Sequence, residues 1–265
     1  MKRFLCLLAA LAMILSFASC KKLGEDNGES ENLTTTAKAP EVKNVTKTAE
    51  FKDENGRVVF TVEVTYPEFS KNAKESTLEY VNRVTSETFA DACKFAESNT
   101  DNAASFMNSS GSTVPWSKKI TFEPSYMSGR YICFFVKEVF SAGASTLSEP
   151  SVSAKCFDIV KGIPCDVMYF FADPEQNFVE TKKKMAELVA QKALYDFNPN
   201  GVGLANLQLE KLKKIFDLHR FFIAEDGMGF FLDRNLLDNT QSGSYTCVIP
   251  WAELEGIFVH PESIA

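Results

Sequence analysis

Residues 131–136 read Tyr-Ile-Cys-Phe-Phe-Val and residues 152–159 read Val-Ser-Ala-Lys-Cys-Phe-Asp-Ile, on either side of the small-residue run Ala142-Gly143-Ala144-Ser145. β-Branched and aromatic residues favour strands, whereas glycine among small residues favours a turn. Lys161-Gly162 is a second turn signal further along the chain. We therefore predict an antiparallel meander with strands at 117–126, 130–140, 152–159 and 163–171.

The residues on both sides of this meander also have clear periodicity. Upstream, residues 58–66 alternate between apolar and polar side chains, residues 72–98 have helical spacing, and residues 99–115 are rich in Ser, Asn and Gly. These patterns predict a half-buried strand, a helix and a loop. Downstream we predict helices at 176–197 and 204–217, a hairpin of 220–223 with 229–232 across Asp226-Gly227, a strand at 244–249 and a short helix from Trp251 to Leu254.

Strands and helices are segregated along the chain rather than strictly alternating. This order predicts an α+β fold with mainly antiparallel sheets and packed helices. We expect two sequential modules, a strand-helix-sheet module at 51–150 and a helix-plus-sheet module at 151–265.

The N-terminal residues predict where the protein is located in the cell. Residues 1–19 have a basic start, an apolar run and small residues before Cys20, which is the pattern of a secretory signal peptide. A cysteine at this junction resembles the lipobox of bacterial lipoproteins, so we expect lipid attachment at Cys20 and an extracytoplasmic anchor in the cell membrane or outer membrane. The alternative is an ordinary signal peptide. Residues 20–50, rich in Lys, Glu, Asn and Thr, predict a disordered tether.

The formal charge of the chain is −7, and loss of Lys2 and Arg3 with the signal would leave −9. An acidic chain without a basic run argues against nucleic acid as a partner. It suits a cationic partner, although solubility alone is the simpler reason for the charge.

Five cysteines remain after the signal peptide and Cys20: Cys93, Cys133, Cys156, Cys165 and Cys247. Equal distances from the predicted turn could place Cys133 opposite Cys156, but we expect buried free thiols that act as small hydrophobic side chains. None of the five cysteines is part of a C-x-x-C pair, so the sequence gives no indication of a zinc site.

No catalytic motif is present, and we expect neither catalytic residues, a metal nor a cofactor. Asp233, Asp238 and Glu253 could serve a hydrolase as acid–base carboxylates. A solvated loop is the simpler interpretation of the two aspartates.

Phenylalanines occur as adjacent pairs in the predicted strands, namely Phe134-Phe135, Phe170-Phe171, Phe221-Phe222 and Phe230-Phe231. Neighbouring residues of a strand point to opposite faces of its sheet. We therefore expect helices to cover both faces; the alternative is an exposed aromatic patch for a partner.

The order of motifs resembles a known family. Phe157-Asp158-Ile159-Val160-Lys161-Gly162 is similar to the family's F/N-D-x-x-x-G strand exit, residues 222–230 to its strand-turn-strand, and Ile249-Pro250-Trp251-Ala252-Glu253-Leu254 to its closing I-P-Y-x-E-L segment. The strand ending Thr65-Tyr66-Pro67 before a helix is similar to its N-terminal module. This is the RsiV/PdaC-type extracytoplasmic domain family, the domain of unknown function 3298 with a 4163-type N-terminal module. This chain departs from the family at the turn that is usually written G-G-A-H-P. Ser145 or Thr146 stands here where the family has histidine.

The resemblance covers nearly all of residues 51–258 and implies a binding module without catalytic activity. Members include the lysozyme-binding domain of RsiV and the non-catalytic N-terminal region of PdaC, so we expect recognition of a protein, lysozyme-like in the sharper version, or of cell-wall glycan such as peptidoglycan. The alternatives are an envelope hydrolase and a purely structural envelope lipoprotein. The residues that we expect at a partner surface are Phe134, Phe135, Ser145, Phe230, Phe231, Leu236 and Leu237.

Overall fold

The computed structural model describes residues 40–70, 75–143, 150–197, 212–233 and 244–264. It has an α+β fold with two mainly antiparallel sheets, as the sequence predicts. The larger sheet contains, in spatial order, β1 (Val42–Lys52), β2 (Val58–Phe69), β3 (Trp116–Met127), β4 (Tyr131–Ser141), β5 (Ser151–Asp158) and β6 (Ile163–Pro164).

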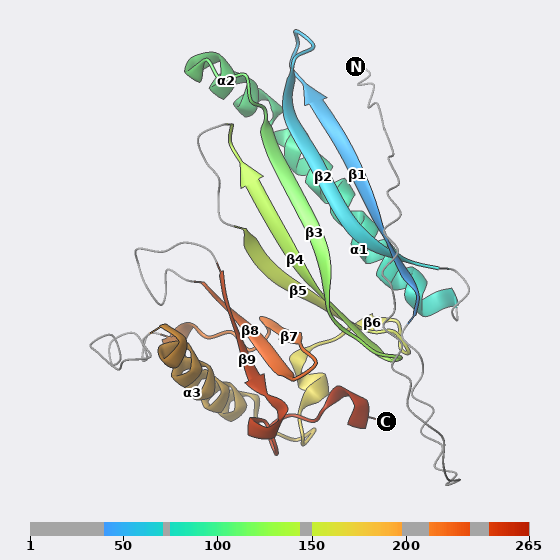
Figure 1. The fold of residues 1–265 in the computed structure, drawn as a ribbon, viewed down its shortest axis with the longest axis vertical. Coiled ribbons are helices and arrows are strands. Elements are labelled where there is room, and N and C mark those ends of the chain that lie inside the picture. Colours follow the sequence, from blue (N-terminus) through green and yellow to red (C-terminus); the bar gives the residue numbers. More distant parts are fainter. Residues whose placement is uncertain (1–39, 71–74, 144–149, 198–211, 234–243, 265) are drawn as a thin grey trace, which may run out of the picture.

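One strand pair of this sheet is parallel. β2 and β3 run in the same direction, because α1 (Glu75–Ser98) and α2 (Thr100–Ser110) connect them in a crossover. Parallel neighbours need such a long connection, whereas the other pairs are antiparallel. In Figure 1, α1 lies behind β1 and β2 and covers that face of the sheet.

The helix α2 corrects the predicted loop at 99–115. Ala103 and Met107, four residues apart, are both buried. Residues at this spacing share one helix face, so contact with the core stabilises a Ser- and Asn-rich helix of weak intrinsic propensity. The helix ends at Gly111, whose φ of 68° is left-handed, the usual glycine stop.

The smaller sheet has the order β7 (Phe221–Ile223), β8 (Gly227–Asp233) and β9 (Ser244–Pro250). It confirms the predicted hairpin, with Phe222 opposite Gly229. Around it lie the 3₁₀ helices η1 (Val167–Phe170), η3 (Trp251–Glu253) and η4 (Pro261–Ser263), and the helix α3 (Phe178–Phe197). Residues 212–215 are helical, while the rest of the helix predicted from residue 204 lies largely outside the described residues.

The predicted strand at 163–171 is mostly wrong. Only Ile163 and Pro164 pair with β5. The carboxylate of Asp166 then accepts a hydrogen bond from the amide of Met168 and begins η1. An aspartate at this position favours a helical turn over continued strand.

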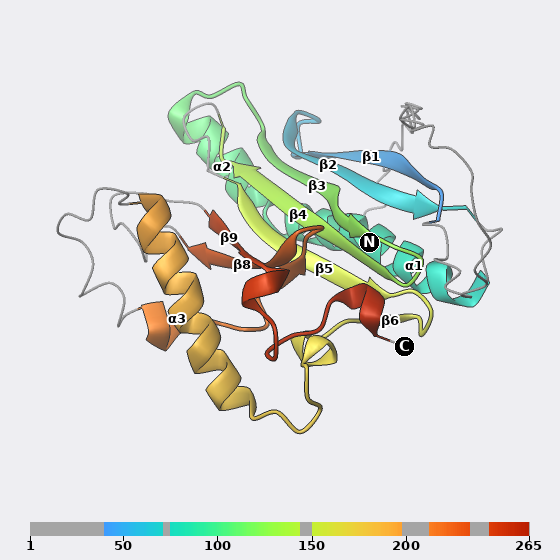
Figure 2. The same cartoon turned by 60° about the horizontal axis from the view of Figure 1, so that its bottom comes forward.

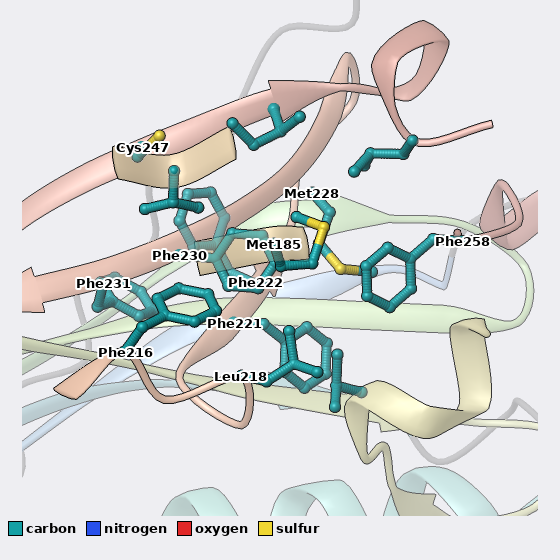
Figure 3. Close-up of a cluster of buried hydrophobic side chains, with 14 of the residues drawn as sticks. Met185, Phe216, Leu218, Phe221, Phe222, Met228, Phe230, Phe231, Cys247 and Phe258 are labelled. Atoms are coloured by element: carbon teal, nitrogen blue, oxygen red, sulfur yellow. The ribbon is translucent and has the colours of Figure 1, made fainter. Parts of the chain in front are cut away.

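The smaller sheet is packed between two layers. Phe135 on β4 contacts Phe222 of β7 at a centroid distance of 4.7 Å and Phe231 of β8 at 6.0 Å. α3 lies on the other side of β8 and β9 (Figure 2), and its buried Met185 belongs to the same core (Figure 3). Both faces of the smaller sheet are therefore covered, as expected for adjacent phenylalanines, but a helix covers only one of them and β4 of the larger sheet covers the other.

Two predicted boundaries need correction. Residues 42–50 of the predicted tether belong to β1, which pairs with β2 along its length. The module boundary at residue 150 cuts the larger sheet, because β5 follows it and pairs with β4. The two hydrophobic cores therefore lie on opposite faces of one sheet: the α1 core contains Phe134, and the core next to α3 contains Cys133.

Candidate functional site

The face of the larger sheet opposite α1 is polar over β1, β2 and β3. Direct pairing joins Thr46 to Thr65 and Thr65 to Thr121, and it places Glu63 next to Lys119. Paired residues share a face of the sheet. The side chains on this polar face are exposed or half-exposed. They are Thr46, Thr48, Glu50, Thr61, Glu63, Thr65, Ser117, Lys119, Thr121 and Glu123.

Cross-strand contacts hold the polar face in place. The hydroxyls of Thr46 and Thr65 are 2.9 Å apart, and Lys119 Nζ lies 2.7 Å from a carboxylate oxygen of Glu63. Lys137 on β4 pairs in the same way with Glu123 at 2.6 Å. Both lysines are thus partly neutralised, so the further carboxylate of Glu50 leaves the polar face acidic on balance. The sequence signal for this face is the polar phase of the alternation at 58–66, which by itself predicts only a strand.

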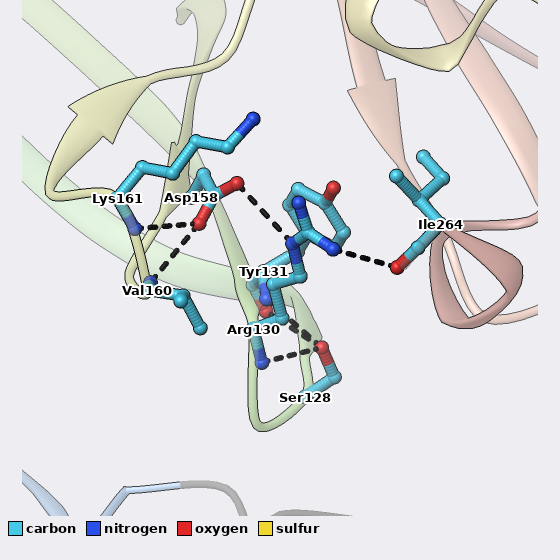
Figure 4. Close-up of polar contacts among 7 residues, drawn as sticks. All are labelled: Ser128, Arg130, Tyr131, Asp158, Val160, Lys161 and Ile264. Carbon is cyan, nitrogen blue, oxygen red and sulfur yellow. Dashed lines mark hydrogen bonds and ion pairs between the residues drawn. The ribbon is translucent and has the colours of Figure 1, made fainter.

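A buried ion pair joins the lower edge of the sheet to the C-terminal segment (Figure 4). Asp158 is fully buried, and one carboxylate oxygen accepts hydrogen bonds from the amides of Val160 and Lys161 at 3.0 and 2.9 Å. Arg130 Nε approaches the other oxygen at 3.3 Å, while its Nη1 donates to the carbonyl of Ile264 at 2.6 Å. Residues of the chain itself supply all these partners of Asp158 and Arg130, so the ion pair is structural.

The phenylalanines predicted at a partner surface lie in the cores. Phe134, Phe230 and Phe231 are at most 2% exposed, and Phe135 is half-buried against the smaller sheet. They give a partner no apolar patch, because sheets or helices cover both faces on which they lie. Ser145, Leu236 and Leu237 lie outside the described residues, as does Cys20.

The carboxylates considered for a hydrolase are not gathered in one site. Asp233 accepts hydrogen bonds from both terminal nitrogens of Arg220, at 3.0 and 3.2 Å. Glu253 is exposed in η3 and is no part of that pair, and Asp238 lies outside the described residues. Within the described ranges, no group of three or more His, Cys, Asp or Glu side chains could hold a metal ion.

Cys133 and Cys156 form a disulfide, which corrects the expectation of free thiols. They are paired directly across β4 and β5, a register that the sequence spacing allowed without fixing. Cys165 and Cys247 keep free thiols. Burial raises the pKa of Cys165 to about 12, and the neighbouring carboxylate of Asp158 adds to this effect. Burial likewise raises the pKa of Cys247 to about 12.

None of the helices in the described part of the chain is both long and apolar enough to span a membrane.

Solved structures share this fold. A DUF3298 family member from Bacteroides fragilis is 14% identical with a TM-score of 0.55, and the match covers 87% of this chain and 98% of that one. A DUF3298 family protein from Pseudomonas aeruginosa PAO1 is 13% identical with a TM-score of 0.55, over 85% and 97% of the two chains. No protein-family model and no curated protein matches the sequence. The chain therefore has the fold of these DUF3298 family proteins.

Proposed function

We propose that this protein is a lipid-anchored, non-enzymatic binding module of the bacterial cell envelope, and that its polar face binds a cationic protein. The observation that carries the proposal is the polar face itself. Its threonines, glutamates and lysines are accessible and fixed in register by two adjacent strand pairs. A rigid surface loses little conformational entropy when a partner binds.

The charge of the chain supports a cationic partner. The whole sequence carries −7, and Glu50 adds an exposed carboxylate to the polar face beside the Glu63–Lys119 pair. Complementary charge increases the rate at which partners meet and disfavours partners of the wrong sign. A lysozyme-like protein fits this chemistry and agrees with what the family resemblance implies.

The composition of the polar face favours a protein over cell-wall glycan. On β1 and β2, the aromatic residues Phe51, Phe60 and Tyr66 point to the α1 side, as their register with one another and their packing against that core show. The polar face at these strands therefore lacks a flat apolar ring on which a sugar could stack. Hydroxyl and charged side chains remain, which suit the polar rim of a protein–protein interface.

Binding of the detergent-purified full chain to chicken lysozyme tests this proposal. We expect saturable binding that weakens as salt is raised, because exposed charges are screened. Glu50→Lys should weaken binding about tenfold, whereas Glu97→Lys on the exposed surface of α1 makes the same charge change and should leave it nearly unchanged.

Equal loss in the two variants would reduce the effect to net charge and contradict a site on the polar face. Binding of purified peptidoglycan instead of lysozyme would replace the protein partner by glycan. Failure to bind either probe would contradict the proposal in its lysozyme-like form.

The anchor has its own test in cells. Fatty-acid labelling should mark the wild-type chain and not Cys20→Ala, and the variant should appear in the soluble fraction because stable attachment needs the lipid. Equal labelling of both chains would exclude Cys20 as the attachment site.

A further inference from the structure

Three cysteines lie side by side across β4, β5 and the segment that follows β6. Cys133 on β4 is directly opposite Cys156 on β5. Beyond β5, the amide of Cys165 donates a hydrogen bond of 2.8 Å to the carbonyl of Cys156. This bond continues the β5–β6 register, in which Phe157 pairs with Pro164 and Asp158 with Ile163. Cys165 is therefore opposite Cys156 on the side away from Cys133.

Residues directly opposite one another in antiparallel strands have Cβ atoms about 4.5–5.5 Å apart on the same face. All three cysteines pack into the core next to α3, which agrees with a shared face. A disulfide needs Cβ atoms about 3.5–4.5 Å apart. Cys165 follows the last residue of β6, so a small shift of this segment would close the difference.

We propose that Cys133, Cys156 and Cys165 form an intramolecular thiol–disulfide exchange site. The Cys165 thiolate attacks Sγ of Cys156, the Cys156–Cys165 bond forms, and the Cys133–Cys156 bond breaks. Cys133 leaves as a thiolate and takes up the proton that Cys165 released. Nothing is oxidised or reduced overall, so the step needs no external oxidant or reductant.

Exchange would move the covalent link from one strand pair to another. In the structure as it stands, the disulfide joins β4 to β5. After exchange it would join β5 to the segment that leads from β6 into η1 and α3. Cys133, which is fully buried between the disulfide partner and the core, would then hold the free thiol.

The surroundings of Cys165 keep its thiol protonated and so disfavour the exchange. Burial and the Asp158 carboxylate raise the pKa of its thiol to about 12, while Arg130 and Lys161 lower it by less. Tyr131 on β4 is a further titratable group that interacts with the same thiol, and Asp166 follows Cys165 directly in the chain. Only the thiolate attacks a disulfide, so exchange should be slow at neutral pH and about tenfold faster for each pH unit between 7 and 9.

Each cysteine lies in its own tryptic peptide, which makes the disulfide readable by mass spectrometry. Residues 131–137 contain Cys133, residues 156–161 contain Cys156, and residues 162–182 contain Cys165. In the full chain carrying Cys133→Ser, oxidised with glutathione and trapped with iodoacetamide, we expect most Cys156 in a cross-link between 156–161 and 162–182. The matched variant Cys165→Ser should keep the cross-link between 131–137 and 156–161.

Recovery of Cys156 and Cys165 as separate alkylated or glutathionylated peptides in a folded Cys133→Ser chain would overturn the proposal. So would a cross-link from Cys156 to Cys93 or Cys247. If the variant does not fold, reoxidation of the dithiothreitol-reduced wild-type chain replaces it. There we expect the Cys156–Cys165 cross-link to appear before the native one accumulates, and its absence at every time point would contradict the exchange.

Discussion

Asp158 shows how one residue can hold three separate segments. It is the fully buried charged residue of the described chain, and it binds the turn after β5 through the amides of Val160 and Lys161. Through Arg130 it also reaches the carbonyl of Ile264 at the C-terminal end. A buried carboxylate costs free energy unless such partners compensate its lost hydration.

We expect Asp158→Asn to lower the free energy of unfolding by about 2–3 kcal/mol, because Arg130 then lacks its charged partner while the two amides keep only a neutral acceptor. Urea unfolding followed by circular dichroism measures this. Asp91→Asn is the control, since the Asp91–Lys94 pair is about three-quarters exposed and should cost at most about 0.5 kcal/mol. Equal stability of the two variants would show that the buried pair contributes nothing.

The hairpin of β7 and β8 shows how an element depends on close packing as well as on its turn. Residues 224–226 connect the strands and Gly227 begins β8, so the turn lies at the predicted short hairpin signal Asp226-Gly227. The ring of Phe222 lies over Gly229 on the opposite strand, so a Cβ at residue 229 would stand 1.9 Å from the ring atom Cζ. Glycine is required here by the approach of the ring and not by its backbone conformation.

Gly229→Ala should therefore destabilise the protein by about 3 kcal/mol, because Phe222 is held between β4 and the smaller sheet and cannot move freely. Gly56→Ala is the matched control. It introduces a Cβ at a positive φ of 79° in open space and should cost only about 1 kcal/mol. Urea unfolding of both variants gives the comparison, and a cost below that of Gly56→Ala would mean that Phe222 has room to rotate.

The molecule as a whole buries ionisable hydroxyl and thiol groups in their neutral forms. Burial raises the pKa of Tyr131, Cys165 and Cys247 to about 12 each, above the ordinary values of about 10 for tyrosine and 8.5 for cysteine. The folded chain therefore holds these protons at a pH where the unfolded chain has released them. The stabilisation is complete below about pH 8 and is lost as pH rises toward 12.

We expect the free energy of unfolding to fall steadily between pH 9 and pH 12. The measurement is urea unfolding at half-unit steps of pH in buffers of constant ionic strength. Cys247→Ala removes one of the three groups, and its stability should fall less steeply over the same interval, even if it starts lower at pH 7. A flat profile to pH 11 would show that these groups are hydrated in the folded chain.

Local patterns of the sequence predicted a large part of this fold. The alternation at 58–66, the helical spacing at 72–98 and the Asp226-Gly227 turn predicted β2, α1 and the β7–β8 hairpin, because each depends on residues close together in the chain. The adjacent phenylalanines also indicated that both faces of a strand are covered. The α+β class with mainly antiparallel sheets followed from the order of these elements.

Contacts between distant residues decided the rest. β1 exists because residues 42–52 pair with β2 and cover its core, although their composition resembles a tether. α2 forms because Ala103 and Met107 pack into the hydrophobic core. The disulfide and the position of Cys165 depend on the register of β4, β5 and β6, where a shift of one residue would turn each cysteine to the other face. The polar face arises in the same way, because only strand pairing brings Thr46, Thr65 and Thr121 together from three separate parts of the chain.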